Sequence, residues 1–372
     1  MNKKTLYIVT ELFPPDETST AYILGEMANA AAREYDVHVI CGPEIYDSRK
    51  KIDENNPFIL NDTIKLTRVY SHGLDKNTKL GKAWSFLTMS LRLYRIAKSK
   101  IKEGDKVLMV TNPAPLVLLM SRLRKKRAFS LNILVHDVFP ENMVSAGLHL
   151  PSLVYRSLKS RYDKAYACAD KLLALGRDMA FILRQKTKNS VPIAIVENWS
   201  DLDNVQPLPF PEGKIKIQYA GNIGRVQGLE SLMENLPNDI ELHFYGTGSM
   251  EKTLKEKRQD NVYFHGPYFR SQQTNVLGSA HVSVVTLEKG MYGLGVPSKT
   301  YNIMAAGRPI LYFGPEDGEI GLLIKEHKIG FIGWPKAWDL DQLAVMGNKA
   351  RIVAEQMYSK EFILDKFLKE LR

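Results

Sequence analysis

The chain of 372 residues is 44% hydrophobic and carries a formal net charge of +10 at pH 7. This is more apolar material than one core absorbs, so the composition predicts two ordinary domains. The longest apolar stretch, residues 107–120, is interrupted by prolines, so we expect no membrane-spanning segment.

The first half of the chain alternates strands with helices. A strand is predicted at residues 6–10, and a helix at 20–33 with Ile23 and Leu24 on its apolar face. The first apolar stretch ends at Glu11 without a cleavage site, and the two cysteines lie far apart, so we expect a cytoplasmic protein. Alternation of this kind predicts parallel sheets with crossover helices. Further strands are predicted at residues 37–40, 107–110, 131–135 and 172–175.

Positive charge is concentrated in the first half. Residues 1–200 hold 31 Lys and Arg against 20 Asp and Glu, whereas residues 201–372 hold 20 against 21. Residues 79–102 mix Trp84 and Leu87 with basic side chains, which suits the interface of a bilayer; a core helix with a basic outer face is the alternative. The basic cluster at residues 122–127 favours an anionic membrane surface as partner. No RNA-binding motif accompanies these segments, so no nucleic acid is expected.

Three polar side chains follow the strand at 131–135. His136 and Asp137 come directly after the strand, and Glu141 follows shortly after them. Residues at a strand end are placed to touch a substrate hydroxyl or a leaving group, and histidine suits proton transfer there. These three are candidate catalytic residues, and a turn that caps a helix is the alternative.

A proline-rich segment separates the basic half from the neutral half. Residues 198–214 contain Pro207, Pro209 and few apolar anchors, which predicts an interdomain linker. Asp201 and Asp203 resemble a metal-binding pair, but they lie in this linker rather than at the end of a strong strand. We therefore expect no metal there.

The strand pattern restarts after the linker. We place the first domain at residues 1–200, the linker at 201–214 and the second domain at 215–355. A C-terminal helix at 356–372 can pack back on the first domain. The chain is thus predicted to be α/β, with two Rossmann-like doubly wound domains that face each other across a cleft and bind ligands at the carboxyl ends of their strands. Strands of the second domain are predicted at residues 215–220, 241–245, 262–265, 282–286 and 309–313.

Two glycine turns follow strands of the second domain. Gly221, Asn222, Gly224 and Arg225 follow the first strand, and Gly246 follows the second. Glycines let the backbone approach a phosphate closely, and an arginine can reach toward it. Ordinary tight turns are the alternative, but the recurrence of such loops at strand ends favours a phosphate site at one edge of the sheet.

The strongest local signal for phosphate binding lies at residues 295–309. Gly295 and Val296 precede Ser298, which is predicted to cap a helix, and Lys299 places a positive charge beside the helix start. In the alternative, Ser298 only caps and Lys299 is a solvated surface lysine. The unpaired amides at a helix start attract a phosphate, so this segment is a candidate diphosphate site.

Together these segments resemble a bacterial retaining glycosyltransferase of family 4, which has the GT-B fold. The resemblance covers nearly the whole chain. It implies a hexosyltransferase that uses a nucleotide-sugar donor and needs no metal or other cofactor. The matching segments are residues 7–32, 136–137, 197–199, 221–225 and 302–309.

The sequence departs from the usual family pattern at three places. A pair of glutamates is replaced by Leu294 and Asn302, a glycine in the first loop is replaced near Thr20, and a phosphate-binding lysine is replaced by Gln227. These changes resemble a subgroup that acts in capsule or O-antigen assembly.

The subgroup resemblance implies roles for individual residues. Arg225 and Lys299 would hold the diphosphate, Glu319 would bind the ribose, and the backbone around residues 293–296 would contact the sugar. The implied donor-binding residues are Gly221, Asn222, Gly224, Arg225, Gly246, Gly295, Val296, Ser298, Lys299, Asn302 and Glu319.

The resulting hypothesis is transfer of a sugar from a UDP donor to a polyprenyl-diphosphate-linked glycan, with retention at the anomeric carbon, at the inner face of the cytoplasmic membrane. His136 would orient the donor sugar, while Asp137 and Glu141 would contact the acceptor. The leaving diphosphate would help to deprotonate the acceptor hydroxyl. The alternatives are a nucleotide-sugar 2-epimerase of the same fold and a nonenzymatic nucleic-acid-binding protein.

Overall fold

The computed structural model describes residues 3–44, 52–53, 56–70, 79–145, 147–224 and 227–372. The chain divides into two compact units. Unit 1 comprises Met1–Val196 together with Leu364–Arg372, and unit 2 comprises Glu197–Ile363. Within the described residues, no helix combines the length and the apolar character needed to cross a bilayer.

Unit 1 is built on a seven-stranded parallel sheet with the order β3-β2-β1-β4-β5-β6-β7. Every strand predicted in the first half of the sequence is present. The sequence did not predict the two edge strands, β3 and β7, which are only four and three residues long. The strands are β1 Thr5–Val9, β2 Asp36–Cys41, β3 Lys65–Arg68, β4 Lys106–Val110, β5 Ser130–Val135, β6 Lys171–Ala174 and β7 Ile193–Ile195.

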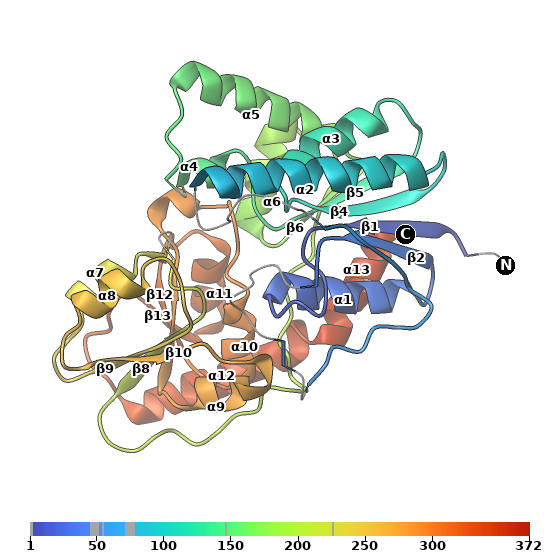
Figure 1. Cartoon of the computed structure of the whole chain (residues 1–372). Helices are drawn as coiled ribbons and strands as arrows, with labels where there is room; N and C mark the ends of the chain where they lie inside the picture. The colour runs from blue at the N-terminus through green and yellow to red at the C-terminus, as the bar shows by residue number, and fades with distance from the viewer. Residues whose placement is uncertain (1–2, 45–51, 54–55, 71–78, 146, 225–226) are drawn as a thin grey trace. The chain divides into compact units, whose positions relative to one another are not determined.

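Helices cover both faces of this sheet, with α2, α3 and α5 on one face and α1 and α13 on the other (Figure 1). The predicted apolar face of α1, including Ile23 and Leu24, is buried. Helix α2 packs on α3 and buries Met89, Leu93 and Ala97, so only part of its surface is free. The helices are α1 Ser19–Ala31, α2 Lys79–Lys100, α3 Pro115–Arg124, α4 Glu141–Ser145, α5 Ser152–Tyr166, α6 Arg177–Thr187 and α13 Lys360–Leu371.

Unit 2 is built on a six-stranded parallel sheet with the order β10-β9-β8-β11-β12-β13. Tyr219, Leu242 and Val284 lie in its buried apolar core. The strands are β8 Lys216–Ala220, β9 Glu241–Tyr245, β10 Val262–Gly266, β11 Val282–Thr286, β12 Ile310–Phe313 and β13 Gly330–Ile332. The helices are α7 Leu229–Glu234, α8 Glu251–Glu256, α9 Gln273–Gly278, α10 Lys299–Ala305, α11 Glu319–His327 and α12 Leu340–Met357.

The segment predicted as a linker is an integral part of unit 2. The Ser200 backbone N–H donates to the Tyr358 carbonyl at 2.7 Å, and the Ser200 hydroxyl donates to the Tyr301 carbonyl at 2.8 Å. The buried Arg308 guanidinium donates to the Pro209 carbonyl at 3.0 Å. These bonds fix residues 197–214 against α10 and α12. The prediction of an interdomain linker from the low apolar content of this segment was therefore wrong.

The end of the chain returns to unit 1. The Tyr35 hydroxyl donates to the Leu371 carbonyl at 3.4 Å, and Lys171 forms an ion pair with Glu370 at 3.0 Å. Residues 364–372 therefore belong to unit 1, whereas residues 356–363 of the predicted terminal segment belong to unit 2.

Candidate functional site

Four loops meet at the carboxyl edge of the unit 2 sheet. They follow β8, β9, β11 and β12, which are neighbours in the sheet, and they carry Gly221, Gly246, Lys299 and Glu319. Parallel strands place all their carboxyl ends at one edge, and ligands of doubly wound folds bind there. The structure thus brings together residues that are far apart in the sequence.

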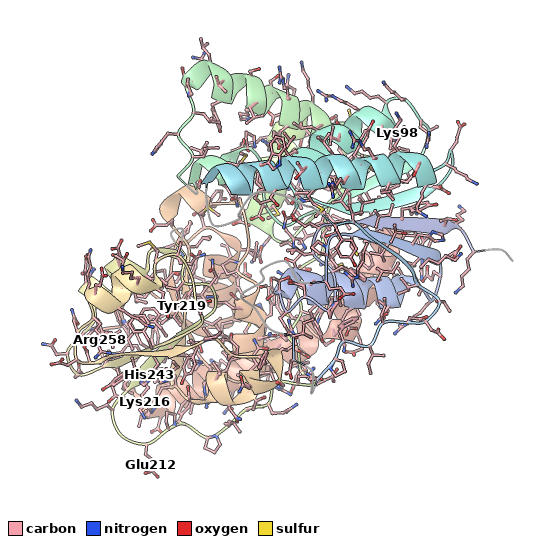
Figure 2. The ribbon with its side chains drawn as sticks, in the orientation of Figure 1. Lys98, Glu212, Lys216, Tyr219, His243 and Arg258 are labelled. Atoms are coloured by element: carbon pink, nitrogen blue, oxygen red, sulfur yellow. The ribbon has the colours of Figure 1, made fainter. Side chains whose placement is uncertain are left out.

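The Lys299 side chain reaches back under the Gly221 turn. Its Nζ lies 3.4 Å from the centroid of the Tyr219 ring. Tyr219 lies on strand β8 (Figure 2). A Cβ atom at Gly221 would stand 2.8 Å from the same Nζ, so the absence of a side chain at Gly221 makes this approach possible. A cation over the face of an aromatic ring is attracted by the ring quadrupole.

The Lys299 ammonium is enclosed, and it has no hydrogen-bond partner among the residues that the structure describes. Burial lowers the pKa of Lys299 to about 7. Enclosing a cation without an anion is unfavourable, and the ring face offsets only part of that cost. An anion placed beside this nitrogen would supply the missing partner, which makes the position suited to a phosphate group.

The recurrent glycines have a packing reason. The Gly221 N–H donates to the Tyr245 carbonyl at 2.8 Å, and the Ile223 N–H donates to the Thr247 carbonyl at 2.9 Å. A Cβ atom at Gly246 would lie 2.0 Å from the Gly221 carbonyl oxygen, and one at Gly248 would lie 2.1 Å from that of Ile223. The two turns pack backbone against backbone, so Gly246 is needed for this contact whether or not a phosphate binds.

The rest of the first glycine turn is described only in part. Arg225 lies outside the described residues. The side chains of Asn222 and Gln227 lie near Gly224, because a Cβ atom there would stand 2.8 Å from Asn222 Nδ2 and 2.7 Å from Gln227 Oε1. The Gln227 Oε1 atom is buried and has no hydrogen-bond partner among the described atoms.

The prediction that Ser298 caps a helix is wrong. Ser298 precedes α10, but its φ and ψ of −62° and −26° are already helical, and its side chain makes no capping hydrogen bond. The first turn closes instead through the Thr300 N–H, which donates to the Pro297 carbonyl at 3.2 Å. Because α10 spans only 7 residues, the case for an anion rests on the Lys299 side chain rather than on a helix dipole.

Four other predicted donor residues differ in their surroundings. The Asn302 side chain accepts from the Asp201 N–H at 3.0 Å and donates to Gln273 at 3.0 Å, so both of its polar atoms bond within the protein. Gly295 and Val296 lie half-buried in the loop before α10. Glu319 is the first residue of α11 and is buried.

In unit 1, the carboxyl edge holds a neutral histidine. The His136 Nδ1 lies 3.3 Å from the Thr20 hydroxyl, at the start of α1, and its backbone N–H donates to the Thr111 hydroxyl at 3.2 Å. The His136 Nε2 is buried with no hydrogen-bond partner among the described residues. Burial lowers the pKa of His136 to about 4, so the ring is uncharged at neutral pH. Such a ring offers one directional bond to a substrate oxygen.

Asp137 lies beside this histidine. Asn142 Nδ2 donates to its carboxylate at 2.8 Å, and burial raises the pKa of Asp137 to about 6. The burial effect dominates, since the bond from Asn142 acts in the opposite direction. A carboxyl group with such a pKa is suited to accept a proton near neutral pH.

Glu141 occupies a different environment. Both of its oxygens accept from the buried Lys186 Nζ, at 2.7 and 2.8 Å. Lys186 also pairs with Asp163 at 2.7 Å, which joins α4, α5 and α6. Both oxygens of Glu141 are thus engaged in an ion-pair network that joins three helices. This arrangement does not support the predicted contact of Glu141 with the acceptor.

The linker aspartates are likewise held by cations. Asp201 pairs with Arg270 at 3.3 Å, and Asp203 pairs with Lys360 at 3.1 Å. Over the described part of the chain, no group of three or more His, Cys, Asp and Glu side chains is arranged to hold a metal ion.

Comparison with known proteins assigns the chain to a family. A family model described as Glycosyl transferases group 1 matches residues 214–332, which contain the Lys299 site. The "Probable glycosyltransferase WbjE" of Pseudomonas aeruginosa is 30% identical, over 97% of this chain and 96% of that protein. This chain belongs to the group 1 glycosyltransferases.

Other relatives agree with this assignment. WcaI of Escherichia coli (strain K12), whose name refers to colanic acid biosynthesis, is 25% identical over 55% of this chain and 57% of that protein. Sucrose-phosphate synthase of Thermosynechococcus elongatus superposes with a TM-score of 0.74 at 14% identity, over 99% of this chain and 98% of that one. Anabaena HepE in complex with UDP superposes with a TM-score of 0.65 at 11% identity, over 99% of both chains. The solved structures show the GT-B fold of two Rossmann-like domains.

Two residues, one in each candidate site, were not predicted from the sequence. Tyr219 supplies the ring beneath Lys299, and Thr20 supplies the partner of His136. Tyr219 lies in an ordinary strand pattern, which gives no sign of a cation above it. The substitution of a family glycine near Thr20 was visible, but only the fold shows that the hydroxyl meets His136.

Proposed function

We propose that this glycosyltransferase binds the diphosphate of a UDP-sugar against the Lys299 ammonium in unit 2. The observation that carries the proposal is an enclosed cation beneath the Gly221 turn, at the carboxyl edge of the sheet, that has no hydrogen-bond partner among the described residues. A diphosphate oxygen there would restore the charge balance that the free protein lacks. The choice of UDP is supported by the UDP complex of HepE.

The proposed reaction keeps the configuration of the anomeric carbon. The acceptor hydroxyl oxygen forms a bond to that carbon, the bond from the carbon to the diphosphate oxygen breaks, and the hydroxyl proton passes to the leaving diphosphate. Lys299 stabilises the negative charge that develops on the leaving group. His136 orients a hydroxyl of the donor sugar through Nε2, and Asp137 lies beside it for contact with the acceptor.

We assign the acceptor to a polyprenyl-diphosphate-linked glycan of surface polysaccharide assembly, at the inner face of the cytoplasmic membrane. The name of the relative WcaI, which refers to colanic acid biosynthesis, supports this class of product. The exposed basic side chain of Arg156 near the start of α5 supports contact with anionic lipid.

Turnover of a panel of UDP-sugars, with and without lipid-linked glycan, tests the proposal. We expect transfer that depends on the acceptor, and an α- or β-linkage in the product, read by NMR, that matches the donor. Lys299→Met should lose transfer, whereas Lys252→Met, which removes an exposed lysine of α8, should retain it. Consumption of donor without acceptor would instead indicate a 2-epimerase, and full activity of Lys299→Met would refute the site.

The proposed chemistry uses no metal, because the Lys299 cation meets the charge of the leaving diphosphate. We therefore predict that turnover persists after treatment with EDTA and does not rise when Mg²⁺ or Mn²⁺ is added back. Measured rates under these three conditions check this, and loss of activity in EDTA that Mg²⁺ restores would contradict it.

A further inference from the structure

Six exposed apolar side chains lie in three segments of unit 1. Leu153 and Val154 in the first turn of α5 are 74% and 51% exposed, and Trp84 near the start of α2 is 51% exposed. Single exposed apolar residues are ordinary, but several in neighbouring segments form a surface that excludes water poorly. We call the six side chains the apolar cluster: Trp84, Leu87, Val144, Leu148, Leu153 and Val154.

The apolar cluster lies at the carboxyl edge of the unit 1 sheet. Helices of a doubly wound unit run opposite to the strands, so each helix begins at the carboxyl edge and ends at the amino edge. Helix α4 begins directly after β5, next to His136, and α5 follows it along the chain. The far end of α2, marked by Lys98 in Figure 2, lies away from α4, which is labelled in Figure 1.

The predicted basic cluster at residues 122–127 lies at the opposite edge. The Arg127 guanidinium donates to the Lys98 carbonyl at 2.9 Å, where α2 ends and the chain turns toward the start of β4. Arg124 forms a bidentate pair with Asp170, at 3.1 and 3.0 Å. Arg122, Lys125 and Lys126 remain exposed. The sequence predicted one membrane surface from these two segments, but the fold places their apolar and most basic parts at different ends.

Positive charge flanks the apolar cluster along the same helix layer. Arg156, one turn after Leu153 on α5, is exposed, and so is Arg161 further along the same helix. The one acidic side chain of α5, Asp163, is paired with Lys159 and Lys186. On the other face of the sheet, α1 carries a single charge, which is negative. Apolar side chains flanked by cations match an anionic bilayer, where the former enter the headgroup region and the latter meet lipid phosphates.

We propose that the apolar cluster inserts into the interface of an anionic membrane and so holds the His136 edge of unit 1 against the lipid surface. The inference rests on the proposed function, because a lipid-linked acceptor presents its diphosphate and first sugars at that surface. Membrane contact at the carboxyl edge, rather than at the Arg122 end, brings the first sugars of the lipid-linked acceptor to the polar residues that follow β5.

Flotation of the full chain on vesicles of phosphatidylcholine with phosphatidylglycerol tests the proposal. We expect Leu153→Glu with Val154→Glu to lower the vesicle-bound to free ratio by about tenfold or more, because two apolar side chains no longer leave water. The control, Val345→Glu with Ile352→Glu, changes two apolar residues of α12 in unit 2 that are 52% and 48% exposed, and it should float like the native chain. Equal flotation of the native chain and the Leu153 variant would overturn the inference.

A second measurement reports insertion without any substitution at α5. Brominated lipid should quench the fluorescence of Trp84, and the quenching should disappear in Trp84→Phe. Unchanged quenching in Trp84→Phe would show that this segment stays in water. If sedimentation shows a native dimer that Leu153→Glu dissociates, the apolar cluster is a contact between copies and the proposal fails.

Transfer assays separate this inference from the proposed function. The Leu153 variant should keep native transfer to a short-chain, water-soluble acceptor but lose about tenfold in transfer to acceptor embedded in vesicles. If the native chain floats and the Leu153 variant does not, but the native chain transfers sugar to neither acceptor, the membrane contact is upheld and the proposed function is refuted. Equal transfer to embedded acceptor by the native chain and the Leu153 variant would count against the membrane contact.

Discussion

The Lys299 ammonium destabilises the ligand-free protein. Its pKa is lowered from 10.5 to about 7, so its cost is present in full below pH 7 and is lost as the pH rises toward 10.5. We expect Lys299→Met to raise the free energy of unfolding of the ligand-free protein at neutral pH by on the order of 2 kcal/mol. Thermal unfolding measures the change, with Lys252→Met as the exposed control. A lower melting temperature for Lys299→Met would contradict this expectation, because it would mean that the Lys299 side chain stabilises the ligand-free protein.

The same titration makes donor binding depend on pH. A bound diphosphate raises the pKa of Lys299 above its value of about 7 in the free protein, so binding takes up a proton at alkaline pH. Affinity for UDP should be constant below pH 7 and fall by up to about tenfold per unit above it. Calorimetric titrations across this range measure the slope. A flat profile that Lys299→Met leaves unchanged would exclude the coupling.

The Thr20 hydroxyl should act through the His136 ring. Thr20→Val keeps the shape of the side chain but removes the bond to Nδ1, so we expect kcat/KM to fall about fivefold, the equivalent of roughly 1 kcal/mol. Thr20→Ser should restore the rate. Nitrogen-15 NMR of His136 should show a changed tautomer balance in Thr20→Val alone. An unchanged spectrum would show that the Thr20 hydroxyl does not act on the His136 ring.

At the scale of secondary-structure elements, the paired turns after β8 and β9 fix the shape of the donor edge. Gly246→Ala would bring Cβ to 2.0 Å from the Gly221 carbonyl oxygen at a φ of +126°. We expect a loss of about 3 kcal/mol or more in unfolding free energy. The control Gly213→Ala also has positive φ but meets nothing within 4 Å, so it should lose only about 1 kcal/mol. Similar denaturation midpoints for the two variants would contradict the packing role.

The central strands were predictable from the sequence because they are continuous apolar runs buried on both faces. Strand β11, with all five residues buried, is the clearest case. The edge strand β3 was missed because three residues of its sequence, Lys-Leu-Thr-Arg, are polar and none of the four is buried. Helix α10 was predicted at the right place, yet its cap was not, since a local Ser-Lys pattern cannot show the backbone angles that the preceding loop imposes.

The candidate site was predictable to the level of the sheet edge. Chain order and strand ends placed Gly221, Gly246 and Lys299 together, because parallel topology fixes which ends meet. Lys299 and Asn302 lie only three positions apart on the short helix α10. The sequence could not show that Lys299 turns onto Tyr219 while Asn302 turns toward Asp201. The sequence also could not show that Lys186 forms an ion pair with the Glu141 carboxylate, because the two residues lie on helices that are distant in the sequence.

At the scale of the whole molecule, the two units differ in how they use charge. The cations of unit 1 that are proposed to meet lipid, such as Arg156, are exposed, whereas unit 2 encloses Lys299. Exposed charges are screened over about 8 Å at physiological ionic strength, and enclosed ones are screened much less. We expect added salt to weaken flotation on anionic vesicles while UDP affinity changes little. Parallel flotation and calorimetry check this, and an equal salt dependence of both would contradict the assignment.

The central claim is that Lys299 holds the donor diphosphate. Titrating uridine and UDP separately into the native chain and into Lys299→Met tests it most directly, because only the diphosphate can sense the ammonium. The native chain should bind UDP far more tightly than uridine, and Lys299→Met should lose most of that preference, by about 100-fold, while its affinity for uridine stays the same. If Lys299→Met keeps the native preference for UDP, the diphosphate lies elsewhere.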